Sequence, residues 1–73
     1  MLKYELKFYD GSTKLTGNSD DNKDVIVNEF NRIKNMSTNE ISMELGLNND
    51  ITVTHIVLMD NRNGKIIKKH SFE

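Results

Sequence analysis

Strict alternation of apolar and polar side chains over residues 2–9 is the feature that most constrains how this chain can fold. One face of the segment comprises Leu2, Tyr4, Leu6 and Phe8. The opposite face comprises Lys3, Glu5, Lys7 and Tyr9. A period of two residues is typical of a strand that buries one face. The segment therefore predicts a half-buried strand with Tyr9 directed away from the core.

The residues that follow predict a hairpin. Asp10-Gly11 suits the positive φ angles of a two-residue type I′ turn. A return strand is then expected over residues 12–17. The expected cross-strand pairs are Leu6 with Leu15, Lys7 with Lys14, and Phe8 with Thr13. This register keeps one face apolar, although it places two lysines opposite each other, which is mildly unfavourable.

An amphipathic helix is expected after the hairpin. Residues 18–24 are polar, and Asp20 or Asp21 is suited to cap a helix whose first turn favours acidic side chains. Apolar residues then recur at intervals of three and four: Val25, Ile26, Phe30, Ile33 and Met36. This spacing places them on one stripe, which indicates a helix of about four turns packed on a sheet.

Residues 37–47 fit two patterns. Ser37 followed by Glu40 matches a capping box, and Gly46 is suited to end a short helix. Four apolar residues nevertheless alternate strictly: Ile41, Met43, Leu45 and Leu47. On a helix these side chains would point to opposite sides, so the pattern favours a strand. We predict a strand over this segment.

The last third of the chain predicts a second hairpin. Residues 51–59 are the most strand-prone run, and both of their alternating sets contain apolar residues. A strand of this kind is buried on both faces and is therefore central in the sheet. Residues 61–64, with sequence Asn-Arg-Asn-Gly, predict a turn, and residues 65–72 form the return strand.

Two registers fit this second hairpin. A two-residue turn pairs Val57 with His70, whereas a three-residue loop with a glycine bulge pairs Ile56 with His70. A shift of one residue reverses the faces of a strand. The sequence therefore leaves open whether Ile66 or Ile67 points inward.

The expected element order is β-β-α-β-β-β, which defines an α+β fold class. Residues 1–73 are expected to form one domain, in which a single amphipathic helix covers one face of a four- or five-stranded sheet. The order and spacing of these elements resemble the β-grasp arrangement of ubiquitin-like and immunoglobulin-binding domains. The resemblance implies a fold and does not imply an activity.

Composition excludes several classes of protein. The 73 residues include no Cys, which excludes a disulfide scaffold, a cysteine zinc site and thiol catalysis. The longest purely apolar run covers residues 56–59, far below the roughly 20 residues of a membrane-spanning helix. The charged residues among 2–9 leave no apolar block of a signal peptide. We expect a cytoplasmic protein with no membrane contact.

No motif predicts catalysis or a cofactor. Residues 20–24 imitate the start of a calcium loop, but Val25 stands where glycine is required and Asn31 where glutamate is required. His55 and His70 lack a convergent third ligand for zinc. A chain this short has little room for an active-site pocket. We therefore expect no enzyme activity, no metal and no cofactor.

Charge is distributed unevenly although the total is only −1. Residues 37–60 carry four acidic side chains and no basic one, and Glu40 and Glu44 lie among them. The only basic cluster comprises Arg62, Lys65, Lys68, Lys69 and His70. Lysines on an edge strand discourage aggregation, and no aromatic residues interleave this cluster as a base-stacking platform requires. The two signs of charge could instead orient a protein partner.

These observations favour a small non-enzymatic protein-binding module that uses a strand edge or a helix face. Ten Asn, eight Lys and seven Ile with no Ala are typical of a low-GC genome, such as a Firmicute, its phage or its plasmid. In that setting the expected partner is a host protein that the module binds and modulates, with inhibition of a defence nuclease as one example. The alternative is a nucleic-acid-binding hairpin that uses the basic segment 61–70. The oligomeric state stays open.

Overall fold

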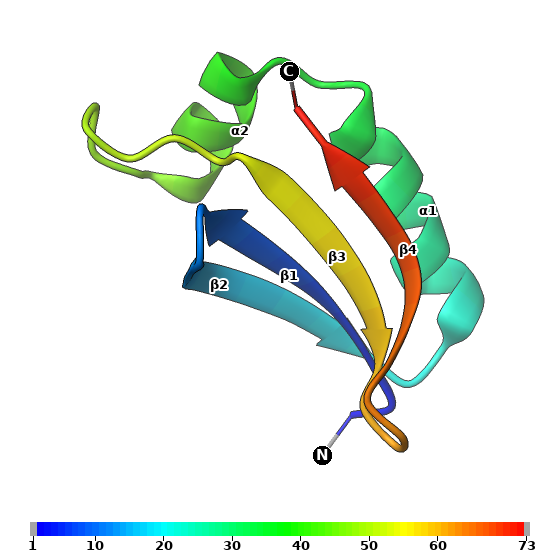
Figure 1. Ribbon diagram of the computed structural model, residues 1–73. Helices are drawn as coiled ribbons and strands as arrows, with labels where there is room; N and C mark the ends of the chain where they lie inside the picture. Colours follow the sequence, from blue (N-terminus) through cyan, green and yellow to red (C-terminus); the bar gives the residue numbers. More distant parts are fainter. Residues whose placement is uncertain (1, 73) are drawn as a thin grey trace.

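Four strands form one antiparallel sheet, and two helices cover one of its faces, in a computed structural model that describes residues 2–72 (Figure 1). In chain order the elements are β1 (Tyr4–Asp10), β2 (Thr13–Asp20), α1 (Lys23–Lys34), α2 (Thr38–Leu45), β3 (His55–Asp60) and β4 (Lys65–Ser71). The strand order across the sheet is β2-β1-β3-β4. The α+β class predicted from the sequence is therefore confirmed.

The predicted strand over residues 37–47 is wrong, because this segment contains helix α2. Both halves of the capping box form: Ser37 Oγ accepts the N–H of Glu40 at 3.2 Å, and the N–H of Ser37 donates to the Glu40 carboxylate at 3.0 Å. Gly46 ends the helix with a φ of 68°. The observed order is ββααββ, so the order on which the β-grasp resemblance rested is not found.

The first hairpin has a different register from the one predicted. Gly11 takes a φ of 58° in the turn, but Phe8 pairs with Thr16 and Lys7 pairs with Gly17. The pairing shifts between Phe8 and Tyr9, where Leu15 is an extra residue on β2. A bulge of this kind leaves one residue unpaired and bends the strand. It removes the predicted opposition of two lysines and directs Leu15 against the core.

The second hairpin also turns at a glycine, because Gly64 takes a φ of 71°. Ile56 pairs with His70, as the three-residue alternative predicted, but the predicted loop length is wrong: Asp60 pairs with Lys65 and leaves four residues in the loop. The bulge lies at Ile67 on β4 rather than at the glycine. Ile67 consequently packs against the core, whereas Ile66 is 58% exposed. Strand β3 is central, as predicted, although it begins at His55 and not at residue 51.

The core lies between the sheet and the two helices. It comprises Leu6, Phe8, Ile26, Phe30, Ile33, Ile41, Val53, Ile56 and Leu58. Helix α1 contributes three of these side chains, and its N-cap is Asn22, which accepts the N–H of Asp24, rather than Asp20 or Asp21. Val25, which was predicted on the buried stripe, is 49% exposed. It precedes Ile26 by one residue, so it lies about 100° around the helix from that buried side chain.

Candidate functional site

Strand β4 lies at one edge of the sheet, and within residues 2–72 it pairs with β3 only. Five of its seven residues are exposed. The N–H of Phe72, one residue beyond the strand, donates to the carbonyl of Thr54 at 3.0 Å. Backbone groups alternate in direction along an antiparallel strand, so those of Lys69 and Ser71 point away from the sheet. Strand β4 therefore presents unpaired donors and acceptors along its outer edge.

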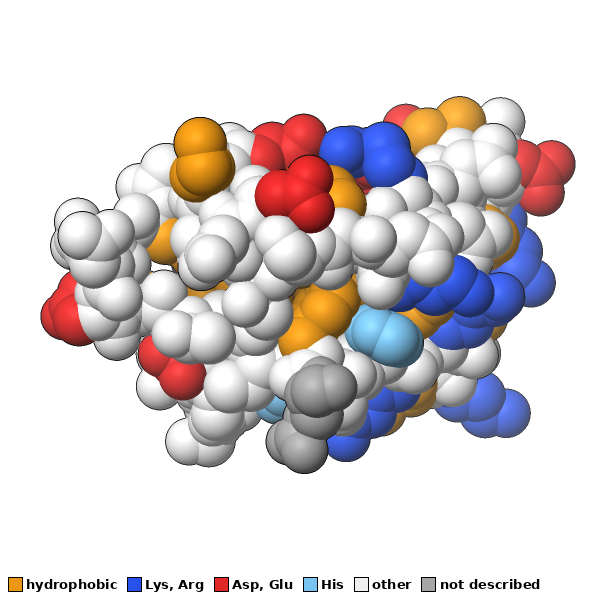
Figure 2. Space-filling model, turned by 90° about the horizontal axis from the view of Figure 1, so that it is seen from above, with side chains coloured by type: hydrophobic (Ala, Val, Ile, Leu, Met, Phe, Trp, Pro, Cys, Tyr) orange, Lys and Arg blue, Asp and Glu red, His pale blue; other side chains and the backbone are white. Residues whose placement is uncertain are grey.

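The predicted basic cluster is divided between the two faces of this strand. Lys68 and His70 pair with Leu58 and Ile56, which places them on the helix-covered face. The Lys68 ammonium lies 5.9 Å from the centre of the Phe30 ring. Lys69 lies on the uncovered face of the sheet. Figure 2 shows Lys and Arg side chains gathered on the side of β4 and α1.

None of the ion pairs among the described residues involves Lys65, Lys68 or Lys69. All three residues are exposed. An external anionic group could therefore approach them without breaking an ion pair of the described residues. In this respect the three lysines differ from Arg62.

Arg62 differs from the other basic residues because its side chain is paired within the chain. Its guanidinium donates to both carboxylate oxygens of Asp60, at 2.8 and 3.0 Å, and lies 5.3 Å from the centre of the Tyr4 ring. The side-chain and backbone hydrogen bonds from Arg62 lower the pKa of Asp60 to about 2. The hydrogen bond to Asp60 correspondingly raises the pKa of Arg62. Arg62 therefore holds the turn of the second hairpin.

The predicted acidic residues also have internal roles. Glu40 completes the capping box of α2, and its pKa is lowered by the hydrogen bonds from the N–H and hydroxyl of Ser37. Glu44 binds Arg32 through two hydrogen bonds of 3.0 and 3.2 Å, and Glu29 binds the same guanidinium at 2.6 Å. These contacts join α1 to α2. Glu40 and Glu44 are exposed but lie on the helical layer, apart from the lysines of β4.

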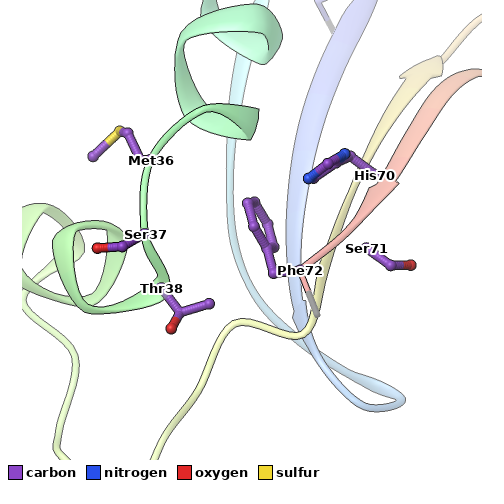
Figure 3. Close-up of a pocket in the computed structure, with 6 residues that line it drawn as sticks. All are labelled: Met36, Ser37, Thr38, His70, Ser71 and Phe72. Atoms are coloured by element: carbon purple, nitrogen blue, oxygen red, sulfur yellow. The ribbon is translucent and has the colours of Figure 1, made fainter.

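A hollow opens where the end of β4 approaches the connection between α1 and α2. Its volume is about 390 Å³, and it is lined by Met36, Ser37, Thr38, His70, Ser71 and Phe72. His70 and Phe72 project from β4 toward this connection, whereas Ser71 projects the opposite way (Figure 3). The two rings meet edge to face with centroids 4.8 Å apart. The hollow could not be expected from the sequence, because a strand was predicted over 37–47 and one wall of the hollow depends on helix α2.

The uncovered face of the sheet carries an aromatic stack. The rings of Tyr9 and His55 are parallel, with centroids 4.8 Å apart. Lys14 lies in the same row, and its ammonium is 2.9 Å from the Glu5 carboxylate. His55 and His70 lie on opposite faces, because Ile56 pairs with His70. Over residues 2–72, no group of three or more potential metal-ligating side chains is found.

Comparison with known proteins does not place the chain in a family. No family model, curated protein or solved structure matches it. The helices of the described region are all too short or too polar to cross a membrane. Function is therefore inferred from the residues of the chain itself.

Proposed function

We propose that this chain is a non-enzymatic protein-binding module that contacts its partner with strand β4. The observation that carries the proposal is an exposed edge strand whose three lysines form no ion pair within the described residues. Edge strands bind partner chains through backbone hydrogen bonds, and complementary charge selects and orients the partner. The two-signed surface of β4 and the helical layer suits such an oriented encounter.

The proposal extends to the role of the module. The Asn-, Lys- and Ile-rich composition without Ala is typical of low-GC bacteria and their phages and plasmids. A module of this size without a catalytic constellation acts by occupying a surface of another protein. We propose that it binds and modulates a host protein, and inhibition of a defence nuclease is one form that this role takes.

Two matched variants test the use of β4. One replaces Lys65, Lys68 and Lys69 with Gln, and the other replaces Lys3, Lys7 and Lys14 with Gln. Both lower the formal charge by three, so only the position of the lost charges differs. Each tagged chain is expressed in a low-GC bacterium, and the co-purifying proteins are quantified by mass spectrometry. Circular dichroism confirms that each variant folds.

We expect the wild type and the control variant to retain the same partner and the β4 variant to lose it. Equal retention by all three chains would contradict a role for β4. Equal loss from both variants would show that total charge matters and that the position of the lysines does not.

A second candidate function is nucleic-acid binding, and a specific observation favours it. The Tyr9–His55 stack lies on the same face of the sheet as Lys7 and Lys69, so a row with two rings lies beside a row with two lysines. Stacked rings beside basic side chains suit single-stranded nucleic acid. We expect no DNA or RNA mobility shift at physiological salt. A shift that the β4 variant abolishes, with a salt slope reduced by up to about three, would favour this candidate instead.

A further inference from the structure

We infer that β4 binds an extended acidic segment of its partner, which adds a fifth strand to the sheet and places one apolar side chain in the hollow lined by Met36, His70 and Phe72. The inference rests on the proposed function, because it names the chemistry of the partner at the same strand. Three independent features support it: the backbone of the edge, the charge of its side chains and the position of the hollow.

The backbone defines the docking segment. The bulge at Ile67 interrupts the regular ladder, and pairing beyond it is regular from Lys68 to Ser71. The N–H and C=O of Lys69 and Ser71 point outward by alternation from the bond between Phe72 and Thr54. These two residues can exchange four hydrogen bonds with an added strand. The added strand therefore lies beside Lys68–Phe72.

The side chains of this segment favour an acidic partner. Residues of an added strand alternate between the two faces of the sheet in step with β4. One partner residue would lie beside Lys68 on the helix-covered face, and another beside Lys69 on the uncovered face. Both lysines are exposed. Opposite charges at such cross-strand positions are favourable, whereas a basic segment would be repelled.

The hollow provides a place for one apolar side chain of the partner segment. A partner residue beside His70 or Phe72 lies on the helix-covered face and points toward the connection between the helices (Figure 3). The hollow of about 390 Å³ lies near the lower end of the roughly 300–1,000 Å³ of ligand sites. Its lining is mixed, because the apolar Phe72 ring stands beside the polar residues Ser37, Thr38 and His70. The Met36 side chain points away from Phe72 (Figure 3). The hollow has room for one large side chain, and the Phe72 ring offers it an apolar contact.

The other edge of the sheet lacks this combination. Strand β2 carries one lysine, Lys14, whose ammonium is already paired with Glu5. The hollow beside Phe72 is lined by no residue of β2, and neither is a second, smaller hollow beside Ser42 and Thr52. The inference therefore applies to β4 alone, and β2 provides an internal control.

Peptide selection tests the chemistry of the segment. The full chain is immobilised and used to select from a random 12-residue peptide library, and the selected peptides are synthesised. We expect acidic peptides with a large apolar residue at a fixed spacing from the acids. With such a peptide bound, amide hydrogen exchange at Lys69 and Ser71 should slow by at least about tenfold, while exchange along β2 stays unchanged. Neutral or basic peptides, or no enrichment, would overturn the inference.

Two substitutions at one position test strand addition. Ser71→Pro removes an outward N–H, which proline tolerates on an edge strand, and Ser71→Ala keeps it. We expect Ser71→Pro to weaken peptide binding at least about tenfold and Ser71→Ala to leave it within about twofold, since only the backbone donor differs. Should Ser71→Pro unfold, hydrogen exchange of the wild type provides the test, because strand addition must slow exchange at both Lys69 and Ser71. Unchanged binding by a folded Ser71→Pro chain would overturn strand addition.

The same variants separate the inference from the proposed function. If Ser71→Pro keeps the cellular partner while the triple Gln variant of β4 loses it, the module binds protein through its lysines and strand addition is wrong. If both keep the partner, the proposed function is wrong as well.

Discussion

The two hairpins have similar strands but differ in loop length, two residues against four, and in the chemistry of their outer strands. Each turns at a glycine with positive φ, Gly11 or Gly64, and each has a bulge whose extra residue, Leu15 or Ile67, packs against the core. Their inner strands, β1 and β3, pair with each other at the centre of the sheet. The outer strand β2 has one lysine, which is paired, whereas β4 has three lysines without an ion pair among the described residues.

This difference distinguishes the residues that the fold requires from the exposed residues that can vary without loss of the fold. Turn glycines and inward-facing apolar residues occur in both hairpins, so they are the shared requirements of the fold. The outward side chains of β2 and β4 carry different charges on similar strands. Folding does not account for the lysines of β4, whereas binding of a partner does. Protection of an exposed edge is the competing explanation, which the experiments on β4 address.

The largest expected effect tests whether the hairpins share one core. Leu6 and Leu58 pair at the centre of the sheet, and both are fully buried. Replacing either with Ala should cost about 2–5 kcal/mol of unfolding free energy, because each change leaves a cavity in the same cluster. Urea unfolding measures the two costs. A cost below about 1 kcal/mol for one variant would show that its hairpin packs independently of the other.

The next effect compares the two turns. Gly11→Val and Gly64→Val should each cost about 1–2 kcal/mol, since a side chain disfavours the left-handed conformation that both residues adopt. Ser12→Val is the control, because Ser12 shares the first turn and does not have a positive φ. Urea midpoints provide the measurement. An unchanged midpoint for one glycine variant alone would show that its hairpin does not depend on that turn.

Acid should distinguish the second turn from the first. The pKa of Asp60 is about 2 in the folded chain, below the usual 3.8, because Arg62 stabilises the carboxylate. A lowered pKa contributes stability above the unfolded value, and this contribution is lost as the pH falls toward the folded value. The wild type should therefore lose stability relative to Asp60→Asn between pH about 4 and about 2. Parallel urea midpoints for the two chains across this range would contradict the role of Arg62.

The smallest expected effect is the change in unfolding free energy when the lysines of β4 are replaced. The triple Gln variant of Lys65, Lys68 and Lys69 should unfold within about 1 kcal/mol of the wild type. The three charges are exposed, and the contact of Lys68 with the Phe30 ring contributes at most about this much. Thermal and urea unfolding at low and high salt measure this difference. A loss above about 1 kcal/mol would assign the lysines of β4 to folding and would weaken the case for binding.

Much of the fold could be predicted from the sequence, and the failures have physical causes. The alternation over residues 2–9 correctly identified Leu6 and Phe8 as buried, and the helical stripe correctly identified Phe30 and Ile33. Leu2 was wrongly placed on the buried face: it precedes β1 and is 44% exposed. The segment 37–47 failed because its apolar alternation imitates a strand, although only Ile41 is buried and Met43 is 83% exposed. The local capping box decided the structure instead.

Registers and the candidate site were harder to predict. A bulge has no distinct sequence signal here, so the extra residues Leu15 and Ile67 could not be placed before the pairing was known. The exposed lysines were identified, but the capture of Arg62 by Asp60 depends on the geometry of the turn. The hollow beside Phe72 requires α2 to be a helix, and it was therefore missed.

The reactivity of lysines in the assembled complex tests the central claim most directly. Each hairpin region carries three lysines, so one chain contains both the test and its control: Lys3, Lys7 and Lys14 against Lys65, Lys68 and Lys69. Acetylation rates of all six are compared by mass spectrometry between the free chain and the chain bound to its captured partner. Binding through β4 predicts protection of Lys65, Lys68 and Lys69 with unchanged rates for the other three. Protection of Lys3, Lys7 and Lys14 with unchanged rates along β4 would contradict it.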